Sequence, residues 1–574
     1  MWPLAVPGMD PQIAHDAAVC ASAAGAVAAD DRIAACTRAI NWGEWPGKDV
    51  EWAYVDRCGA EGDKAADDNA VSDCTEAIRL NPKDAVAFNN RGKAWHAKGD
   101  NDRAIADYDE AIRLNPKDAV AFNNRGKAWF DKGESDRAIA DYDEAIRLKP
   151  NYGVALVNRG RAWQAKGDND RAIADYDEAI RLDPKEALIY YNRGRARQAK
   201  GDNDRVIADY DEAIGLNPKD AVAFNNRGRA WFDKGESDRA IANYDEAIRL
   251  DPKLAVAFTN RGNAWVAKGD RERAIADYGE AIRLTPTAVA FINRGNAWFE
   301  TGDNDRAIAD YDEAIRLDPK EALIYYNRGR AWQAKGDNDR AIADYDEAIG
   351  LNPKYELAFI NRGRAWHAKG DYDRAIAGYD EAIRLDPKDA VAFDNRGIAW
   401  HAKGDNDRAI ADYDEAIRLN SKDAHAYLGR GVVFIAKGSL AAAQADFAQA
   451  NALDPKYAYA ALWLDVAERR NGLPSTLPEL SAQLDMTAWP APVVRHLMGE
   501  IDLATLLAAA GDPDPGKARG KLCEARFFAG ELALLNGGKD DAGGLFRLAA
   551  SECPNNLLQW SAATAELRAL GAAP

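Results

Sequence analysis

The long middle of this 574-residue chain contains no cysteine. All six cysteines lie near the two ends, four before residue 75 and two after residue 522. A structural zinc site needs closely spaced Cys and His ligands, and no two cysteines here have the spacing of a two-Cys knuckle. The sequence therefore predicts no metal site, and it shows no motif that would hold a cofactor.

Long hydrophobic runs are also missing, and positive charge is not in excess. No stretch approaches the roughly 20 unbroken apolar residues of a membrane span, and the formal net charge of -18 does not suit a protein that coats nucleic acid. Residues 1–31 contain no Lys or Arg and are interrupted by Pro3, Pro7 and Pro11, unlike a secretory signal. We expect no transmembrane segment, no nucleic-acid partner and no signal peptide in this chain.

The sequence also lacks a set of residues at a spacing that is typical of a catalytic site. The six histidines are scattered without a Cys, Ser or acidic partner at a catalytic spacing; they are His15, His96, His367, His401, His425 and His496. No glycine-rich loop has the pattern that holds a phosphate. The sequence predicts that the protein is not an enzyme and has no catalytic residues.

A near-identical segment recurs along most of the chain. The segment 81–92 recurs along the chain, and its prolines are spaced 34 residues apart. This spacing is shortened once, to 33 residues, near Thr287. Within one unit Phe88, Gly92 and Trp95 share one helical face, and Ala104 and Tyr108 share another. Gly99-Asp100 separates the two halves. Each unit is therefore predicted to be an antiparallel pair of helices.

This pattern resembles the tetratricopeptide repeat, a 34-residue helical hairpin with an aromatic residue, Gly, Trp, Ala, Tyr, Ala and Pro in this order. Eleven close copies begin at Ala85, Ala119, Gly153, Ala187, Ala221, Ala255, Ala288, Ala322, Glu356, Ala390 and Ala424. The resemblance implies an all-α fold, a right-handed superhelical solenoid of stacked hairpins. We expect degenerate N-terminal caps at 1–84, the regular array at 85–457, an irregular helical region at 458–521 and a capping hairpin at 522–574.

The cysteines fall into three pairs that the repeat register brings together. Cys58 stands at the position of Gly92 and Cys74 at that of Tyr108, where the two helices of a hairpin are expected to be closest. Cys20 and Cys36 have the same spacing, and Cys523 and Cys553 open and close the last hairpin. We predict three disulfides; the alternative is six buried free thiols.

Disulfides would favour an oxidising, extracytoplasmic location such as the periplasm, with the cytoplasm as the alternative. The layout of the caps resembles bacterial tetratricopeptide proteins of the cell envelope.

The resemblance implies that the first helix of each unit lines a concave groove. The sixth position of that helix is Asn in ten successive copies: Asn90, Asn124, Asn158, Asn192, Asn226, Asn260, Asn293, Asn327, Asn361 and Asn395. Such a ladder could hold an extended peptide backbone, and it resembles the asparagine ladder of the O-linked N-acetylglucosamine transferases, whose catalytic domain this chain lacks. The alternative is that the identity reflects recent duplication, since residues 187–219 and 322–354 differ at only two positions.

The ninth position is often basic: Lys93, Lys127, Arg161, Arg195, Arg229, Arg330 and Arg364. Together with the Asn ladder it resembles the carboxylate clamps of chaperone-binding relatives, which would favour acidic or C-terminal peptides; a solvated charged face is the alternative. The fifth and twelfth positions vary more and are candidates for specificity. The seventh position is Arg, which we expect to lie on the neighbouring aromatic residues and pair with an acid at the position of Asp107.

Three functions remain open. A peptide-binding scaffold or adaptor, with protein or peptide partners, fits the array best. A self-assembling structural protein would instead form oligomers, and a subunit of an enzyme complex would carry an activity in residues 458–574.

Overall fold

The computed structural model describes residues 9–22, 25–45, 49–64, 67–554 and 557–572. Pro3 and Pro7, on which the expectation for the N-terminal segment partly rests, lie outside these residues. The described residues form 33 α-helices, one short 3-10 helix and no β-strand element. None of these helices is long and apolar enough to cross a membrane.

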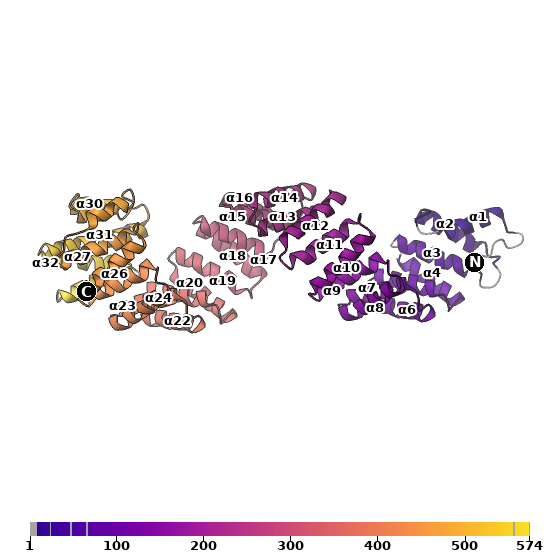
Figure 1. The fold of residues 1–574 in the computed structure, drawn as a ribbon, viewed down its shortest axis with the longest axis horizontal. Coiled ribbons are helices and arrows are strands. Elements are labelled where there is room, and N and C mark those ends of the chain that lie inside the picture. Colours follow the sequence, from indigo (N-terminus) through magenta and orange to yellow (C-terminus); the bar gives the residue numbers. More distant parts are fainter. Residues whose placement is uncertain (1–8, 23–24, 46–48, 65–66, 555–556, 573–574) are drawn as a thin grey trace. The chain divides into compact units, whose positions relative to one another are not determined.

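The chain divides into two compact units, residues 1–270 and 271–574, and each is described by itself (Figure 1). The helices of the first unit are α1 (Pro11–Cys20), α2 (Ala29–Asn41), α3 (Glu51–Asp63), α4 (Asp67–Leu80), α5 (Ala85–Ala97), α6 (Asn101–Leu114), α7 (Ala119–Asp131), α8 (Ser135–Leu148), α9 (Gly153–Ala165), α10 (Asn169–Leu182), α11 (Ala187–Gln198), α12 (Asn203–Leu216), α13 (Ala221–Asp233), α14 (Ser237–Leu250) and α15 (Ala255–Ala267).

The second unit contains the rest of the repeats and the C-terminal helices. Its elements are α16 (Arg271–Leu284), α17 (Ala288–Glu300), α18 (Asn304–Leu317), α19 (Ala322–Ala334), α20 (Asn338–Leu351), α21 (Glu356–Ala368), α22 (Tyr372–Leu385), α23 (Ala390–Lys403), α24 (Asn406–Leu419), α25 (Ala424–Ala436), α26 (Leu440–Leu453), α27 (Ala458–Arg470), α28 (Leu477–Leu480), the 3-10 helix η1 (Ser481–Gln483), α29 (Ala491–Leu497), α30 (Leu503–Ala509), α31 (Pro515–Leu535), α32 (Lys539–Glu552) and α33 (Leu558–Ala569).

The predicted hairpins form because capping residues recur at fixed places. Each of the eleven copies begins at the first residue of a helix, as the repeat register predicts. In the first copy the Asp84 carboxylate accepts a hydrogen bond from the Val86 amide at 2.7 Å. Gly99 then takes a positive φ of 80°, and Asp100 caps the second helix. The prediction of an all-α solenoid of hairpins is confirmed within each unit.

The two helices of a hairpin meet most closely at a glycine and an aromatic ring. A Cβ added at Gly92 would lie 2.7 Å from Cε1 of Tyr108, which is buried. In the last hairpin, Gly530 approaches Phe546 in the same way, at 2.7 Å. Since a methyl group cannot fit at either place, the glycines allow the close helix contact that their recurrence predicts.

The three predicted disulfides are present. The Cα–Cα distances are 4.7 Å for Cys20–Cys36, 5.5 Å for Cys58–Cys74 and 5.0 Å for Cys523–Cys553, and these pairs account for all six cysteines. The Cys58–Cys74 bridge links α3 and α4 at the place where glycine and tyrosine meet in a regular copy. The covalent bond therefore replaces a packing contact in a degenerate hairpin.

First helices of successive copies contact one another directly, for example α5 with α7, α7 with α9, α19 with α21 and α21 with α23. Within the described residues, the second helices of successive copies show no comparable contact. First helices thus crowd together while second helices spread apart. Within each unit the first helices therefore form the inner side of the curve, which we call the inner face.

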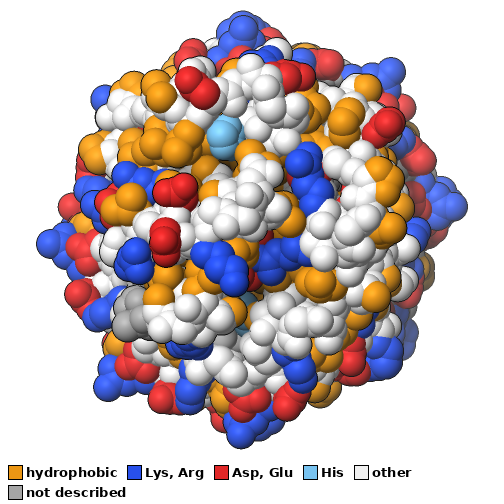
Figure 2. Space-filling model, turned by 90° about the vertical axis from the view of Figure 1, so that its left-hand side faces the viewer, with side chains coloured by type: hydrophobic (Ala, Val, Ile, Leu, Met, Phe, Trp, Pro, Cys, Tyr) orange, Lys and Arg blue, Asp and Glu red, His pale blue; other side chains and the backbone are white. Residues whose placement is uncertain are grey.

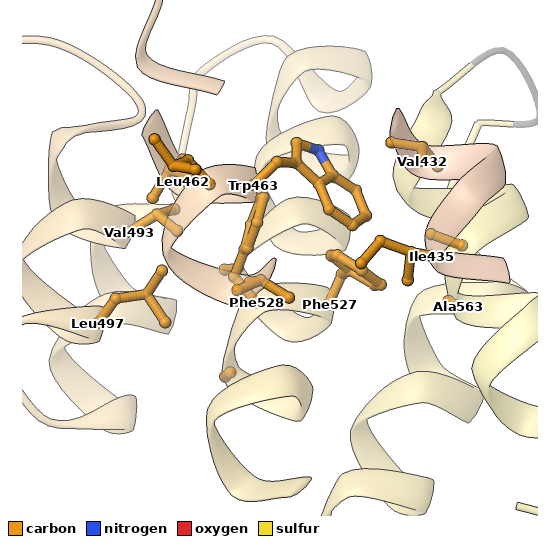
Figure 3. Close-up of a cluster of buried hydrophobic side chains, with 14 of the residues drawn as sticks. Val432, Ile435, Leu462, Trp463, Val493, Leu497, Phe527, Phe528 and Ala563 are labelled. Carbon is orange, nitrogen blue, oxygen red and sulfur yellow. The ribbon is translucent and has the colours of Figure 1, made fainter. Parts of the chain in front are cut away.

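A larger hydrophobic core ends the second unit. Trp463 on α27 packs against Phe527 and Phe528 on α31, with ring centroids 5.1 and 5.7 Å away (Figure 3). Helix α31 begins at Pro515, after Asp514 has capped its first amides, so the domain boundary placed at residue 521 falls inside this helix. Residues 458–509 form the short helices α28 to α30 after α27, and the exact division of this region stays a prediction.

Candidate functional site

The predicted Asn ladder lies on the inner face. Sixth-position residues sit on the first helices and are buried or half-buried, and none of the ten is fully exposed. The structure thus places them together along each unit, although what they bind stays a prediction.

Several ladder residues also connect one copy to the previous one. Their side-chain amide donates to the fifth-position side chain 35 residues earlier, at 2.9 to 3.1 Å. The pairs are Asn124 with Asn89, Asn158 with Asn123, Asn226 with Tyr191, Asn260 with Asn225, and Asn361 with Tyr326. An amide carries two hydrogens and a carbonyl oxygen, so a second hydrogen remains for a ligand.

The bond fails where the fifth-position residue is apolar. Asn192 follows Val157 by 35 residues; its amide nitrogen is buried without a hydrogen-bond partner, and its exposed fraction is 5%. Asn395 follows Ile360 and turns to the backbone oxygen of Val391, 2.6 Å away. Sequence reasoning assigned the fifth position to specificity alone and missed this second role, because the partner lies in another copy.

The ninth-position basic residues point away from the core and are exposed. Arg161 lies over the ring of Phe130 at 5.5 Å, and Arg330 lies over that of Phe299 at 4.7 Å. Arg364 donates to Oδ1 of Asn395 at 3.0 Å. Among the described residues none of the seven forms an ion pair, so their positive charge is free to meet a ligand.

The seventh-position arginines hold the hairpins together, as predicted. Arg328 donates to both oxygens of Asp344 at 2.9 and 2.6 Å, and to Asp312 of the previous copy at 2.5 Å. Its guanidinium carbon lies 5.7 Å from the centre of the Tyr325 ring. Because one side chain joins two helices of its own copy and one of its neighbour, this arginine is structural.

Burial changes the ionisation of this pair. Burial raises the pKa of Asp344 above its ordinary value, although the hydrogen bonds and charge of Arg328 act to lower it. Burial acts to lower the pKa of Arg328, but Asp344 and Asp312 keep it above its ordinary value, so this side chain stays charged. The pair therefore supports a fixed geometry of the hairpin.

Histidine positions give no catalytic or metal arrangement among the described residues, where no cluster of three His, Cys, Asp or Glu side chains could hold a metal ion. His96 lies 2.8 Å from a carboxylate oxygen of Asp131, and His401 lies 2.8 Å from Oδ1 of Asn406. His367 and His401 are both buried, and the Nε2 atom of each has no hydrogen-bond partner. Burial lowers the pKa of His367 to about 4, so its imidazole is neutral at pH 7.

The inner face is covered at the C-terminal end of the second unit. In α25 the fifth, ninth and twelfth positions are Leu428, Val432 and Ile435, and their exposed fractions are 2%, 1% and 7%. They share one core with Ala563 and Phe527, and Figure 3 shows Ile435 beside both. In the sequence, this covering of the inner face is indicated by the change from basic to apolar residues at the ninth position. Figure 2 views this end of the molecule, where hydrophobic, basic and acidic side chains are interspersed.

Models of known protein families match several parts of this chain. Models described as "TPR repeat" match residues 160–201, 228–269, 295–336 and 399–438, and models described as "Tetratricopeptide repeat" match residues 68–119, 97–153, 187–220 and 326–390. Together these matches span more than half of the chain. A search among curated proteins finds no match.

Solved structures also match this chain, at low sequence identity. The APC/C hetero-tetramer Cut9-Hcn1 is 15% identical over 75% of this chain and 98% of its own, with a TM-score of 0.38. A tetratricopeptide repeat protein from Parabacteroides merdae ATCC 43184 is 22% identical over 43% and 98%, with a TM-score of 0.37. YrrB, described as a TPR protein with an unusual peptide-binding site, is 24% identical over 32% and 95%, with a TM-score of 0.29.

The assignment of this chain to a protein family rests on the family models and not on these distantly similar structures. Stacked repeats of this kind present extended surfaces for other proteins. The chain belongs to the tetratricopeptide repeat family and is, in general terms, a scaffold for protein–protein interaction.

Proposed function

We propose that this protein is a non-catalytic scaffold that binds extended segments of partner proteins along the inner face of its first helices. The ligand is a protein or peptide, and no cofactor takes part. Backbone groups of the ligand meet the Asn ladder, and its acidic side chains meet the ninth-position Lys and Arg residues.

The observation that carries this proposal is the burial of the inner face by the chain itself. Leu428, Val432 and Ile435 occupy the fifth, ninth and twelfth positions of α25, which contacts α33 and shares one hydrophobic core with residues of α31 and α33. The seven Lys and Arg residues at the ninth position of earlier copies are exposed, whereas Val432 at the ninth position of α25 is buried. At this end the inner face packs against a C-terminal segment of the chain itself. This contact supports the proposal that the rest of the inner face binds segments of partner proteins.

Charge favours an acidic partner. The chain has a formal net charge of -18, but the ninth-position row is basic and free of ion pairs within the described residues. Acidic segments would be repelled by most of the surface and attracted to this row, which would orient their approach.

The test compares two variants with the same change in charge. In the first, Lys93, Lys127, Arg195 and Arg229 become Gln on the inner face. In the matched control, four arginines of second helices become Gln; these are Arg113, Arg147, Arg181 and Arg249, each exposed and paired with a Glu three residues earlier. Partners captured from native extract are then quantified by mass spectrometry, after circular dichroism has confirmed equal helix content.

Partners that the inner-face variant loses and the control keeps would support the proposal. Partners that both variants retain equally would contradict it, because the basic row would then contribute nothing to binding.

We also infer that the protein resides where thiols are oxidised, since every cysteine is paired. Thiol alkylation of freshly lysed cells, followed by a gel-shift assay, tests this inference. Six reactive thiols in the native protein would overturn it.

A further inference from the structure

Ten successive copies expose an aliphatic side chain at the second position of their first helix, with exposed fractions between 41% and 60%. These residues, which we call the aliphatic row, are Val86, Val120, Val154, Leu188, Val222, Val256, Val289, Leu323, Leu357 and Val391. Single exposed aliphatic residues are normal on a protein surface. A row that recurs from copy to copy is instead typical of a surface that other chains contact.

The hairpins themselves do not require this row. Valine is a poorer helix former than alanine, and a side chain that stays half exposed adds little to a core. Duplication alone does not account for the row, because leucine replaces valine at Leu188, Leu323 and Leu357. Over the same ten copies the fifth position changes among Asn, Val, Tyr, Thr, Ile and Asp. The second position therefore keeps its aliphatic character while a neighbouring position on the same helix varies.

The aliphatic row ends where the chain covers its own inner face. The second position is His425 in α25 and Tyr459 in α27. Nδ1 of His425 lies 3.0 Å from the hydroxyl oxygen of Tyr457. Tyr459 donates to Oε2 of Glu524 at 2.7 Å, and the indole of Trp489 donates to the same oxygen at 2.6 Å. Polar side chains with partners in the chain itself thus replace the aliphatic ones at this end.

The aliphatic row runs beside the Asn ladder and the basic ninth-position residues. Positions two, six and nine of one helix are spaced i, i+4 and i+7, so they share one face. In the copy that begins at Ala119 they are Val120, Asn124 and Lys127. Along the helix axis the Asn ladder lies about 6 Å beyond the aliphatic row, and the basic residues lie about 4.5 Å further. The Asn ladder therefore lies between an aliphatic edge and a positively charged edge.

An extended peptide matches three rows of this kind in one orientation. Successive side chains of a β-strand point to opposite sides, and its backbone N–H and C=O groups point perpendicular to them. With one backbone edge on the Asn ladder, every second side chain lies over the aliphatic row and the others lie over the basic row. Aliphatic side chains complement the first row, and acidic side chains complement the second.

We propose that the inner face selects extended partner segments in which aliphatic and acidic residues alternate. The aliphatic side chains pack on the aliphatic row, the acidic ones meet the ninth-position Lys and Arg residues, and the Asn ladder holds the backbone between them. This inference rests on the proposed function and adds to it the sequence pattern of the ligand.

The first test measures by fluorescence anisotropy how tightly two pools of dodecapeptides bind the intact protein. Both pools are acetylated and amidated, so that no terminal charge takes part. In the alternating pool Val, Leu or Ile alternates with Asp or Glu; in the paired pool two aliphatic residues are followed by two acidic ones. We expect the alternating pool to bind about tenfold more tightly, because half of the side chains in the paired pool face the wrong row.

Replacing all ten residues of the aliphatic row by Ser should remove this preference. Because these side chains are exposed, the variant should keep its helix content, which circular dichroism checks. The control variant replaces four exposed leucines outside the row by Ser and should retain the preference; these are Leu216, Leu317, Leu473 and Leu548. A preference that survives in the row variant would contradict the inference.

Crosslinking to the wild-type protein tests the same geometry without any substitution. One peptide carries a benzophenone side chain at an aliphatic position and a second peptide carries it at an acidic position, and mass spectrometry identifies the crosslinked residues. The first probe should react beside the aliphatic row, and the second should react beside the basic ninth position. Identical crosslinks from both probes would overturn the inference.

The binding data also separate this inference from the proposed function. If both pools bind equally well, and the variant with Lys93, Lys127, Arg195 and Arg229 changed to Gln binds both more weakly, the proposed function stands and the alternating pattern is wrong. If neither pool binds, both proposals are wrong.

Discussion

The side-chain amide of Asn260 donates to Oδ1 of Asn225 at 2.9 Å, which joins the first helices α15 and α13 of successive copies. The corresponding bond is lost between Val157 and Asn192, and the amide nitrogen of Asn192 remains buried and unpaired. The fifth and sixth positions therefore act as a pair across the boundary between copies. A ladder residue thus has a structural role in addition to any role in binding.

The substitution Val157→Asn should restore the missing acceptor and stabilise the boundary between α9 and α11 by about 1 kcal/mol. Hydrogen exchange of the α11 amides measures this locally, since repeat arrays do not always unfold in one step. Val154→Asn is the matched control, because Val154 is exposed on the same helix. Equal protection in the two variants would contradict the pairing.

Replacing Arg328 by Leu should destabilise the second unit by about 3 kcal/mol, since Asp344 would stay buried without its partner. Burial already raises the pKa of Asp344, and loss of Arg328 removes what lowers it. An acid whose folded-state pKa is raised contributes stability below its unfolded pKa, and that stability is lost as pH rises through the folded pKa. Urea unfolding should therefore show a larger defect at pH 7 than at pH 4.

Arg316→Leu serves as the control for that experiment. Arg316 forms an exposed pair with Glu313 on the neighbouring helix α18, and such pairs contribute little. The urea midpoint of this variant should stay close to that of the wild type at both pH values. A defect as large as that of Arg328→Leu would show that loss of any arginine is harmful.

Gly329→Ala should destabilise its hairpin by about 1 to 3 kcal/mol, because the new Cβ would lie 2.8 Å from Cε1 of the buried Tyr345. Gly350→Ala, in the same hairpin, should instead stabilise it by about 1 kcal/mol, since nothing lies within 4 Å and the helix gains a better helix former. Thermal unfolding followed by circular dichroism compares the two. A loss of stability in both variants would refute the packing argument.

His367 should make the second unit sensitive to mild acid. Burial lowers its pKa to about 4, below the ordinary 6.5. The contribution of His367 to the free energy of unfolding is therefore fully present above pH 6.5. It is lost as pH falls through 6.5 toward 4, by an amount on the order of 3 kcal/mol. His367→Gln should reduce the difference in unfolding free energy between pH 7 and pH 4.

Asp394 has the opposite effect on the pH dependence of stability. Its pKa is raised to about 7, so its contribution to the free energy of unfolding is lost as pH rises. Comparison of wild type with His367→Gln at each pH cancels this background. Identical pH profiles for the two proteins would contradict the role of His367.

Reduction of Cys58–Cys74 should weaken only the N-terminal hairpin. The bridge closes a loop of 16 residues, for which about 3 kcal/mol of stabilisation is expected. Cys58→Ala with Cys74→Ala should increase hydrogen exchange in α3 and α4 and leave α9 and α10 unchanged. Loss of protection throughout the first unit would show that the cap controls the whole array.

Much of the fold follows from local sequence. The 34-residue period, Asp84 as a cap, Gly99 at the turn and the small residue at Gly92 all act within one copy, so they predict each hairpin and its boundaries. The position of the seventh-position Arg between aromatic and acidic residues was predictable for the same reason. The cysteine pairs were predictable because they occupy positions already in contact in a regular copy.

The sequence by itself determined the repeat, the helices, the disulfides and the candidate rows of Asn and basic residues, because these depend on near neighbours. Only the tertiary structure decided which side chains meet across copies, as with Asn260 and Asn225, and which end of the inner face is covered. Leu428 and Leu567 share one core although they lie far apart along the chain. Such contacts depend on how successive helices stack, and no local pattern specifies that.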